Sequence, residues 1–306
     1  MATATSDRST AIGVIGVGAM GEPIARRLLG AGFRVIVRDV IAGRMRALVE
    51  SGASAASSAA EVARQADVVL TVVVDAVQTD DVLFGDDGVA AAARDGLTIV
   101  MCSTVAPAYA RTLGARLAPH RISVVDAPIS GGPARALDGT LSMMIGGDDA
   151  TIGRVRDVLE AVASRRFHVG QRGGDGSAMK IVNNMLAGIN LAAAAEALAL
   201  AERLGMDLNV VRDVVNASSG GSWMFADRVP RLIDRDYSPA KAASKILCKD
   251  VGLALDEADA AGVPAAIARA AHHVYAGTVA QGLGEADDAA VIEYYRAQIA
   301  LAINTD

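Results

Sequence analysis

A lysine and an asparagine stand four residues apart at the start of a long apolar run. They are Lys180 and Asn184, within GDGSAMKIVNN at residues 174–184. Residues at i and i+4 lie on one face of a helix, so both side chains would point the same way. A neutral lysine can accept a proton from a hydroxyl group, and an asparagine can hold a substrate by hydrogen bonds. The pair predicts a site at which a bound hydroxyl group loses its proton.

Proton acceptance places a requirement on Lys180. Catalysis near neutral pH needs a lysine pKa of roughly 7 to 8, against about 10.4 for an ordinary lysine. At about 1.36 kcal/mol per pKa unit, that difference is on the order of 4 kcal/mol. Burial between two domains and a neighbouring positive charge would both lower the pKa. A solvated surface lysine could not do this work, and the spacing alone leaves that alternative open.

A glycine pattern near the N-terminus predicts a dinucleotide site. Gly16, Gly18 and Gly21 follow the predicted strand AIGVI and precede the predicted helix EPIARRLL. In such a turn the first glycine permits the tight bend, the second lets the pyrophosphate approach the backbone, and the third lets helix and strand pack closely. With Ala19 and Met20 they form the predicted cofactor-binding turn. A glycine-rich turn without a ligand is the alternative, and the flanking strand and helix argue against it.

An acidic residue bears on which dinucleotide is bound. Asp39 ends the second predicted strand, about twenty residues after the glycine turn. A carboxylate there accepts hydrogen bonds from ribose hydroxyl groups and repels a 2′-phosphate, which favours NAD over NADP. Arg38 stands directly before it and could face a phosphate instead, so NADP remains the alternative. A solvated strand end is the simpler interpretation of Arg38.

The rest of the first half alternates strand and helix. The β-rich runs ADVVLTVVV, LTIVMCSTV and ISVVDAPIS are separated by helical or loop sequence. This pattern predicts an α/β fold with a Rossmann-type doubly wound parallel sheet. Such sheets bind ligands in the loops that follow the carboxyl ends of the strands. The loops of interest are DAVQ at 75–78, STVAP at 103–107 and APISGGPARALDG at 127–139.

The third of these loops carries groups that suit an anion. Gly131 and Gly132 leave two backbone N–H groups accessible at a strand end, and Ser130 adds a hydroxyl donor. Together they predict a binding site for a substrate carboxylate. A glycine turn that links two strands is the alternative.

The second half is predicted to be helical. Residues 178–204 contain no proline and a single glycine, and they predict a helix about 40 Å long that joins two domains. The segment RGGDG at 172–176 is the predicted boundary. The sequence thus predicts a Rossmann domain over residues 1–172 and an all-helical substrate and dimerisation domain over residues 173–306. Further helices are expected near residues 207–217, 240–261, 264–281 and 286–301.

Composition excludes several classes of protein. The chain has 306 residues, 52% of them hydrophobic, which argues against disorder, and its net charge of −6 gives no footprint for nucleic acid. Cys102 and Cys248 cannot form a disulfide framework, and the four histidines show no spacing typical of metal ligands. The first ten residues, MATATSDRST, do not resemble a signal peptide, and no apolar span suggests a membrane helix. We expect a cytoplasmic protein without a metal.

Taken together, the motifs identify a family. GVIGVGAMGEPIARRLL, STVAP, DAPISGGPARALDGTLSMMIGG, GDGSAMKIVNN and KDVGLAL occur in an order that resembles the β-hydroxyacid dehydrogenases, the 3-hydroxyisobutyrate dehydrogenase-like family. The resemblance covers nearly the whole chain. It implies a Rossmann domain followed by an all-helical domain in a homodimer or homotetramer. It also implies that Lys180 is the catalytic lysine and Asn184 the asparagine that positions the substrate.

The resemblance assigns roles to further residues. Ser130, Gly131 and Gly132 match the loop that grips the substrate carboxylate. Thr104 and Lys249 match residues that contact the cofactor or lie over the active site, so Lys249 is assigned to both cofactor and substrate.

A later segment bears on the substrate. GGSWMFADRVPRLIDRDYSPAKAA looks more like the corresponding part of L-threonate dehydrogenases than that of 3-hydroxyisobutyrate dehydrogenases. Within it, Trp223 and Phe225 either form a wall of the substrate pocket or pack in the helical core.

The expected function is NAD-dependent hydride transfer to or from a short-chain 3-hydroxy acid, such as 3-hydroxyisobutyrate or L-threonate. Lysine would serve as the general acid and base. One alternative is an NADPH-linked reductase of a small aldehyde acid such as tartronate semialdehyde. The other is a nucleotide-binding regulator that has lost its chemistry.

Overall fold

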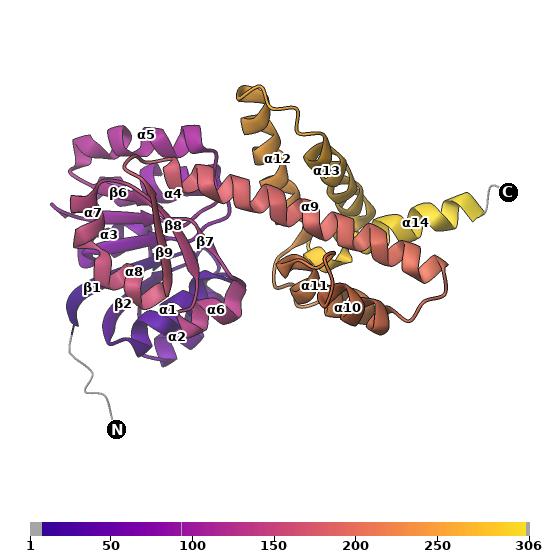
Figure 1. Cartoon of the computed structure of the whole chain (residues 1–306). Helices are drawn as coiled ribbons and strands as arrows, with labels where there is room; N and C mark the ends of the chain where they lie inside the picture. Colours follow the sequence, from indigo (N-terminus) through magenta and orange to yellow (C-terminus); the bar gives the residue numbers. More distant parts are fainter. Residues whose placement is uncertain (1–7, 93, 304–306) are drawn as a thin grey trace. The chain divides into compact units, whose positions relative to one another are not determined.

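The computed structural model describes residues 8–92 and 94–303, and Figure 1 shows their helices and strands. The chain folds as two compact units, Met1–Lys180 and Ile181–Asp306. The division falls inside the long helix α9 (Asp175–Arg203). The boundary expected between residues 172 and 173 lies just before this helix and stays a prediction. Residues 1–7, most of the polar N-terminal segment, lie outside the described residues.

In the first unit, strands and helices alternate as predicted. The strands are β1 (Arg8–Ile15), β2 (Phe33–Arg38), β3 (Ser54–Ala55), β4 (Val68–Thr71), β5 (Thr98–Met101), β6 (Ser123–Asp126), β7 (Ile129–Ser130), β8 (Ser142–Gly146) and β9 (Arg165–Gly170). The helices are α1 (Gly21–Gly30), α2 (Arg46–Glu50), α3 (Ala59–Gln65), α4 (Ala76–Phe84), α5 (Pro107–Leu117), α6 (Gly132–Asp138), α7 (Asp149–Arg154) and α8 (Arg156–Val162). Short turns of helix are η1 (Ala42–Met45), η2 (Val89–Ala91) and η3 (Ala118–His120).

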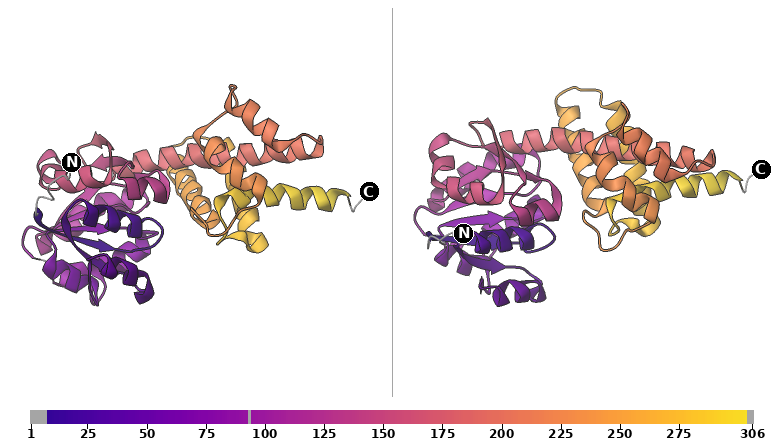
Figure 2. Two further views of the ribbon diagram at one scale, coloured as in Figure 1. Left: turned by 90° about the horizontal axis from the view of Figure 1, so that it is seen from below. Right: turned by 60° about the horizontal axis from the view of Figure 1, so that its bottom comes forward.

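The strands form one sheet with helices on both faces (Figure 2). The order is β3-β2-β1-β4-β5-β6-β8-β7, with β9 paired to β8, and the strands from β3 to β6 run parallel. Alternate residues of a strand enter different cores, because successive side chains point to opposite faces. In β2, Val35 and Val37 belong to the core that includes Ile24 of α1, whereas Ile36 belongs to the core that includes Val62 of α3. The Rossmann-type fold is confirmed.

The end of the sheet beyond β6 differs from a simple parallel pattern. Strand β8 runs antiparallel to both β6 and β7, and β9 then pairs with β8 in parallel. The chain between β7 and β8, residues 131–141, is shorter than the dozen or more residues that a parallel crossover usually needs. Strand β9 was not predicted, because nearly all of its side chains are exposed and RRFHVG shows no alternation of apolar and polar residues.

The second unit is all-helical, as predicted. Beyond the C-terminal part of α9 it contains α10 (Leu208–Asn216), α11 (Trp223–Asp234), α12 (Ser244–Ala260), α13 (Ala266–Thr278), η4 (Val279–Leu283), η5 (Asp288–Val291) and α14 (Ile292–Ile303). The sequence analysis missed α11, since Pro230 stands in its interior and two glycines precede it. A local signal was present: the side chain of Ser222 accepts a hydrogen bond from the Phe225 N–H at 3.0 Å, which caps the helix.

Helix α9 is more apolar than the sequence analysis allowed for. It has 29 residues, and an 18-residue window with a mean hydropathy of 1.4 makes it long and apolar enough to cross a membrane. Half of that window is buried, however, and Leu191 and Leu198 lie in the core of the helical unit. At Gly188 a Cβ atom would lie 2.4 Å from Val251 Cγ2, and Tyr275 donates its hydroxyl hydrogen to the Gly188 carbonyl at 2.8 Å. Packing within this unit therefore accounts for part of the apolar sequence.

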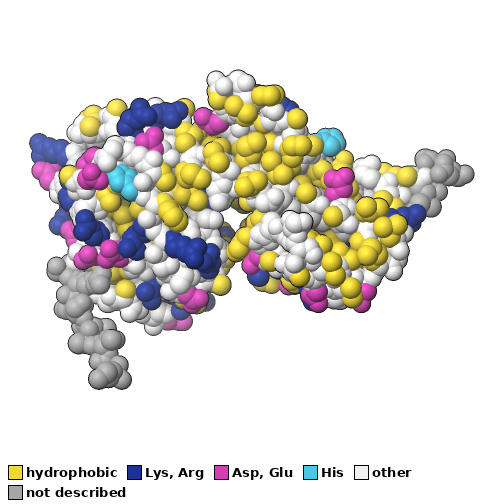
Figure 3. Space-filling model, in the orientation of Figure 1, with side chains coloured by type: hydrophobic (Ala, Val, Ile, Leu, Met, Phe, Trp, Pro, Cys, Tyr) yellow, Lys and Arg dark blue, Asp and Glu magenta, His cyan; other side chains and the backbone are white. Residues whose placement is uncertain are grey.

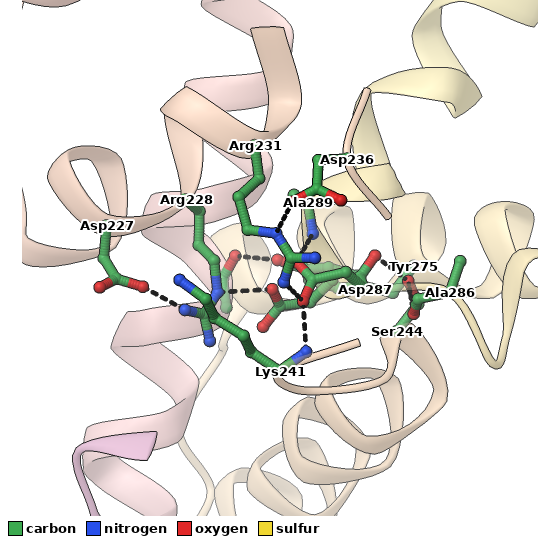
Figure 4. Close-up of polar contacts among 12 residues, drawn as sticks. Asp227, Arg228, Arg231, Asp236, Lys241, Ser244, Tyr275, Ala286, Asp287 and Ala289 are labelled. Carbon is green, nitrogen blue, oxygen red and sulfur yellow. Dashed lines mark hydrogen bonds and ion pairs between the residues drawn. The ribbon is translucent and has the colours of Figure 1, made fainter. Parts of the chain in front are cut away.

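A buried network of arginines and aspartates joins α11 to η5 (Figure 4). Arg228 Nε donates to Asp288 Oδ1 at 2.6 Å, and Arg231 Nη1 donates to Asp287 Oδ2 at 2.5 Å. Asp287 Oδ2 also accepts the backbone N–H of Lys241 at 2.7 Å. Buried charges are costly unless they are paired and hydrogen-bonded, as these are. The network fixes the segment before α12 against α11 and η5.

Candidate active site

Each of the three glycines in the turn between β1 and α1 is required for a different structural reason. Gly16 has a φ of 90°, and a Cβ atom there would lie 2.4 Å from the carbonyl oxygen of Val72. At Gly21 a Cβ atom would lie 1.8 Å from the Gly16 carbonyl oxygen, so a side chain would push α1 off the turn. Next to Gly18 there is open space, with Arg44 Nη1 at 3.9 Å from an added Cβ. A pyrophosphate can therefore approach the backbone there, at the N-terminus of α1.

Asp39 follows β2 and is connected to this turn. Its side chain is buried, with 5% of the residue exposed. Oδ2 accepts the backbone N–H of Val17 at 2.9 Å, and Oδ1 accepts that of Ile41 at 2.8 Å. Arg44 Nη1 lies 3.5 Å from Oδ1. Asp39 thus holds the turn in place and brings a negative charge beside it.

A cavity of about 560 Å³ opens over the turn. Its walls come from the glycine turn, the end of β2, η1 and the start of α4, and include Gly16, Gly18, Arg38, Asp39, Arg44 and Gln78. The structure therefore brings the predicted Asp39 and the predicted glycines together in one cavity. It also brings two arginines there, which matters for the choice between NAD and NADP.

Two further loops leave the carboxyl ends of β5 and β6. Thr104 is half-buried in the first of them. In the second, Ser130 ends β7 and α6 begins at Gly132. Gly131 has a φ of 137° and Gly132 a φ of 78°, conformations that side-chain-bearing residues rarely adopt. The strand end, the two glycines and the helix start are therefore adjacent, as a site for a carboxylate requires.

The start of α9 is attached to the end of β6 through Asp126. Its Oδ2 accepts the backbone N–H groups of Gly174 and Ser177, both at 2.8 Å, and its Oδ1 accepts the Ser177 hydroxyl at 2.7 Å. Burial raises the pKa of Asp126 from the ordinary value of 3.8, while the hydrogen bonds from Ser177 and Gly174 act in the opposite direction. Lys180 lies three residues after Ser177 on the same helix.

Lys180 and Asn184 lie about one turn apart on α9, and each is only 8% exposed. Lys180 is therefore not a solvated surface lysine. Asn184 Nδ2 donates to Asp250 Oδ2 at 2.6 Å, and Asn183 Nδ2 donates to Asn184 Oδ1 at 3.0 Å. Lys249 Nζ forms an ion pair with Asp250 Oδ1 at 2.7 Å. The structure thus brings Asn184 and the predicted Lys249 together around one carboxylate.

Comparison with known proteins agrees with these features. Residues 11–170 match the NAD binding domain of 6-phosphogluconate dehydrogenase, and residues 174–295 match the family described as NAD-binding of NADP-dependent 3-hydroxyisobutyrate dehydrogenase. L-threonate dehydrogenase of Cupriavidus necator is 43% identical over 284 residues, which is 93% of this chain and 95% of that protein. The chain belongs to the β-hydroxyacid dehydrogenase family.

Solved structures of this dehydrogenase family have the same fold. A 3-hydroxyisobutyrate dehydrogenase from Salmonella typhimurium has a TM-score of 0.88 at 38% identity and covers 93% of this chain and 99% of its own. The Mycobacterium tuberculosis 3-hydroxyisobutyrate dehydrogenase with L-serine has a TM-score of 0.81 at 32% identity, with 94% and 100% covered. The resemblance stated from the motifs is confirmed. The protein is an NAD(P)-dependent 3-hydroxyacid dehydrogenase, so the alternative of a non-catalytic regulator no longer applies.

Three residues at the dehydrogenase's candidate site were missed by sequence reasoning. Asp126 opens the DAPISGG motif, and Asp250 directly follows Lys249 in KDVGLAL. For Asp250 the available signal was an acidic residue next to a predicted site residue, and for Asp126 it was an acidic residue directly before the predicted loop at 127–139. Arg44 lies in the 3-10 turn after β2, where nothing in the local sequence distinguishes it from a solvated arginine.

The aromatic residues of α11 divide between two environments. Phe225 is 4% exposed and belongs to the core of the helical unit, so it packs as a core residue. Trp223 is the first residue of the helix and is 54% exposed. Of the two interpretations from the sequence, core packing describes Phe225 but not Trp223.

Proposed function

We propose that this dehydrogenase oxidises the hydroxyl group of a short-chain 3-hydroxy acid with NAD, or carries out the reverse reduction. The observation that carries the proposal is the buried pair Lys180 and Asn184 on one face of α9. A buried amine on the same helix face as a buried amide is the arrangement that proton transfer from a bound and oriented hydroxyl group requires.

The residues of the first unit fit a nicotinamide dinucleotide. The open space at Gly18 suits a pyrophosphate, and Asp39 stands where it can accept hydrogen bonds from a ribose. When bound, the nicotinamide ring supplies the acceptor for the hydride that leaves C3 of the hydroxy acid.

The chain's own residues bind the substrate and move the proton. Ser130 Oγ and the N–H groups of Gly131 and Gly132 bind the substrate carboxylate. Asn184 orients the hydroxyl group, and the neutral Nζ of Lys180 accepts its proton as the C3–H bond breaks. In the reverse direction Lys180 returns the proton to the oxygen.

Thr104 and Lys249 complete the proposed site. Thr104 lies in the loop after the carboxyl end of β5. Open α/β sheets bind ligands at the carboxyl ends of their strands, and Thr104 contacts the cofactor there. Lys249 is held by its ion pair with Asp250, next to Asn184, and contacts cofactor or substrate.

The preference for NAD rests on the charge of Asp39, which repels a 2′-phosphate. One observation favours a second candidate. Arg38 and Arg44 line the same cavity, and guanidinium groups bind phosphate well. Together with the NADP-dependent family matched by residues 174–295, they support an NADPH-linked reductase of a small aldehyde acid such as tartronate semialdehyde.

L-threonate is the first substrate to test, since the C. necator relative carries that name at 43% identity. The screen should include 3-hydroxyisobutyrate, L-serine and D-glycerate, each with NAD and with NADP, followed by cofactor absorbance. Lys180→Met removes the amine at similar side-chain length and should lower kcat by roughly 100-fold or more. Lys245→Met, at an exposed lysine on α12, should change kcat little. Full turnover by Lys180→Met would remove the lysine from its role.

We further propose that the protein is a homodimer or homotetramer assembled through its helical unit. Exposed apolar residues recur at a spacing of four along α9, directly after it and along α10; they are Val182, Leu186, Leu200, Leu204, Val210 and Val214. Figure 3 shows hydrophobic side chains gathered over this unit. Contiguous apolar surface of this kind is typical of interfaces between copies. Light scattering on the protein and on Leu186→Glu should show a mass that falls toward the monomer in the variant.

We place the enzyme in the cytoplasm. Cys102 and Cys248 are both free cysteines, and burial raises the pKa of the Cys102 thiol to about 12, which keeps it protonated. A chain with reduced cysteines suits a reducing compartment.

A further inference from the structure

We propose that Asp126 is a positioning residue for Lys180. It fixes the first turn of α9 to the end of β6, the strand from which the Ser130 loop also leaves. The inference rests on the proposed function, because it takes Lys180 as the proton acceptor.

The contacts of Asp126 are those of a helix cap supplied from a distant strand. The first N–H groups of any helix have no partner within the helix. Here the partner of two such groups, at Gly174 and Ser177, is a carboxylate about 50 residues earlier in the chain, and the Ser177 hydroxyl bonds its other oxygen. Asp126 is 2% exposed, so water competes little for these bonds. A negative charge at a helix N-terminus is also favoured by the helix dipole.

Close backbone packing holds the same turn independently. A Cβ atom on Gly176 would lie 2.5 Å from the Met144 carbonyl oxygen and 2.6 Å from that of Asp126. A Cβ atom on Gly146 would lie 2.7 Å from the backbone nitrogen of Gly176. The first turn of α9 therefore lies directly against β6 and β8. This explains the glycine within GDGS and leaves the helix little room to slide.

Asp126 affects both the proton acceptor, Lys180, and the loop that we propose binds the substrate carboxylate. Ser177 and Lys180 are three residues apart and share a helix face. Because Ser177 is held in place, the Cα atom from which the Lys180 side chain extends is held in place as well. Four residues beyond Asp126 stands Ser130, which we assign to the substrate carboxylate. One carboxylate thus sets the position of the proton acceptor relative to the loop that holds the acid. A displacement of about 1 Å between such groups can lower a rate roughly 100-fold.

Asp126→Asn tests the inference. The amide keeps the shape but loses the negative charge at the helix N-terminus, and its NH2 end can no longer accept a hydrogen bond from the Ser177 hydroxyl or from an N–H group. We expect kcat for L-threonate, or for the best acid of the screen, to fall roughly 10- to 100-fold. NADH affinity and binding stoichiometry should stay within about twofold, since the glycine turn is untouched, and the deuterium isotope effect at C3 should rise. A purely structural role would instead lower NADH stoichiometry and kcat in parallel.

The matched control is Asp148→Asn. Asp148 caps α7 by accepting the Thr151 N–H at 2.8 Å, and α7 carries no residue that we assign to the site. This variant loses a similar cap and should keep its kcat.

A second measurement does not depend on activity. Hydrogen exchange of the full chain should be faster over residues 174–182 in Asp126→Asn than in the parent, and unchanged there in Asp148→Asn. If Asp126→Asn does not fold, Ser177→Ala serves instead, with a kcat lowered roughly 2- to 10-fold and faster exchange in the same segment.

The outcomes separate the two proposals. An inactive Lys180→Met together with a fully active Asp126→Asn overturns the inference and leaves the proposed function standing. An active Lys180→Met overturns the proposed function. Unchanged exchange over residues 174–182 in Asp126→Asn, or in Ser177→Ala where that variant is used, overturns the inference whatever the activity.

Discussion

The side-chain amide of Asn184 donates a hydrogen bond to Asp250 Oδ2 at 2.6 Å. Asp250 is 4% exposed, and its other oxygen pairs with Lys249 at 2.7 Å. An amide has a donor at one end and an acceptor at the other, so this bond decides which end of Asn184 faces which way. Asn183 donates to the acceptor end at 3.0 Å, which agrees with the same orientation. Asp250 therefore orients the asparagine that we propose positions the substrate.

Replacement of Asp250 by asparagine should show this dependence. An amide can donate to Asn184 as well as accept from it, so the orientation is no longer imposed, and the ion pair with Lys249 is lost. We expect kcat/KM to fall roughly tenfold or more, because the substrate hydroxyl is held less often in the reactive geometry. Steady-state kinetics with the best substrate provide the measurement.

The control for this experiment is Asp256→Asn, an exposed aspartate on the same helix. It should leave kcat/KM within about twofold of the parent. Equal values for the parent and for Asp250→Asn would show that Asn184 is oriented by other groups.

Much of the fold follows from patterns of short range. The glycines at 16, 18 and 21 and the strand and helix around them occupy one stretch of sequence, and the turn has the predicted geometry. The long apolar run likewise predicted α9. Elements that lack a local pattern were missed: β9 is an exposed edge strand, and Pro230 interrupts the helical signal of α11.

The partners of the site residues were beyond local patterns. Asp126 and Ser177 are 51 residues apart, and Asn184 and Asp250 are 66 apart. Neither pair shows a spacing that one sequence could reveal, because the contact exists only after the chain has folded. The residues that we propose for hydride transfer could be named from the sequence, but the carboxylates that hold them could not.

Cofactor preference should respond to Asp39 and Arg44 in opposite directions. Both Asp39 oxygens accept backbone N–H groups. Alanine would remove both hydrogen bonds, whereas asparagine removes one of them together with the charge, so Asp39→Asn disturbs the turn less. Without the negative charge, discrimination against NADP should fall by about tenfold, or about 1.4 kcal/mol. Arg44→Ala removes a positive charge that lies 3.5 Å from Asp39, so this variant should bind NADP more weakly than the parent does.

The measurement is the ratio of kcat/KM with NAD to that with NADP. Arg46→Ala serves as control, since Arg46 is exposed and only two residues away from Arg44. A ratio that does not move in Asp39→Asn would mean that Asp39 serves the turn and not the choice of cofactor.

Gly21→Ala should abolish cofactor binding. The added methyl group would lie 1.8 Å from the Gly16 carbonyl oxygen, so the start of α1 must move away from the turn that receives the pyrophosphate. Gly30→Ala lies on the same helix, where a Cβ atom meets nothing within 4 Å, and it should stabilise the protein by about 0.5–1 kcal/mol. NADH titration by fluorescence should show no saturable binding for Gly21→Ala and parental affinity for Gly30→Ala. Parental affinity in Gly21→Ala would refute this account of the turn.

The buried network of the helical unit predicts a pH dependence of stability. Burial, with Asp287 beside it, raises the pKa of Asp288 from 3.8 to about 7, although the Arg228 guanidinium opposes the shift. Between these two pH values the folded state holds a proton that the unfolded state has released. The contribution of Asp288 to the free energy of unfolding is therefore largest below about pH 4, falls by up to about 1.4 kcal/mol per pH unit, and is flat above about pH 7.

Trp223, the one tryptophan of the chain, stands at the start of α11 and reports on unfolding of this unit. Denaturant unfolding followed by its fluorescence at pH 5, 6, 7 and 8 should show that the free energy of unfolding of the parent, minus that of Asp288→Asn, falls as the pH rises to about 7 and is constant above it. Asp213→Asn changes an exposed residue of α10, and its free energy of unfolding should depend on pH in the same way as that of the parent. A difference between parent and Asp288→Asn that stays constant over this range would show that Asp288 is already ionised in the folded protein at pH 5, held so by Arg228 at 2.6 Å.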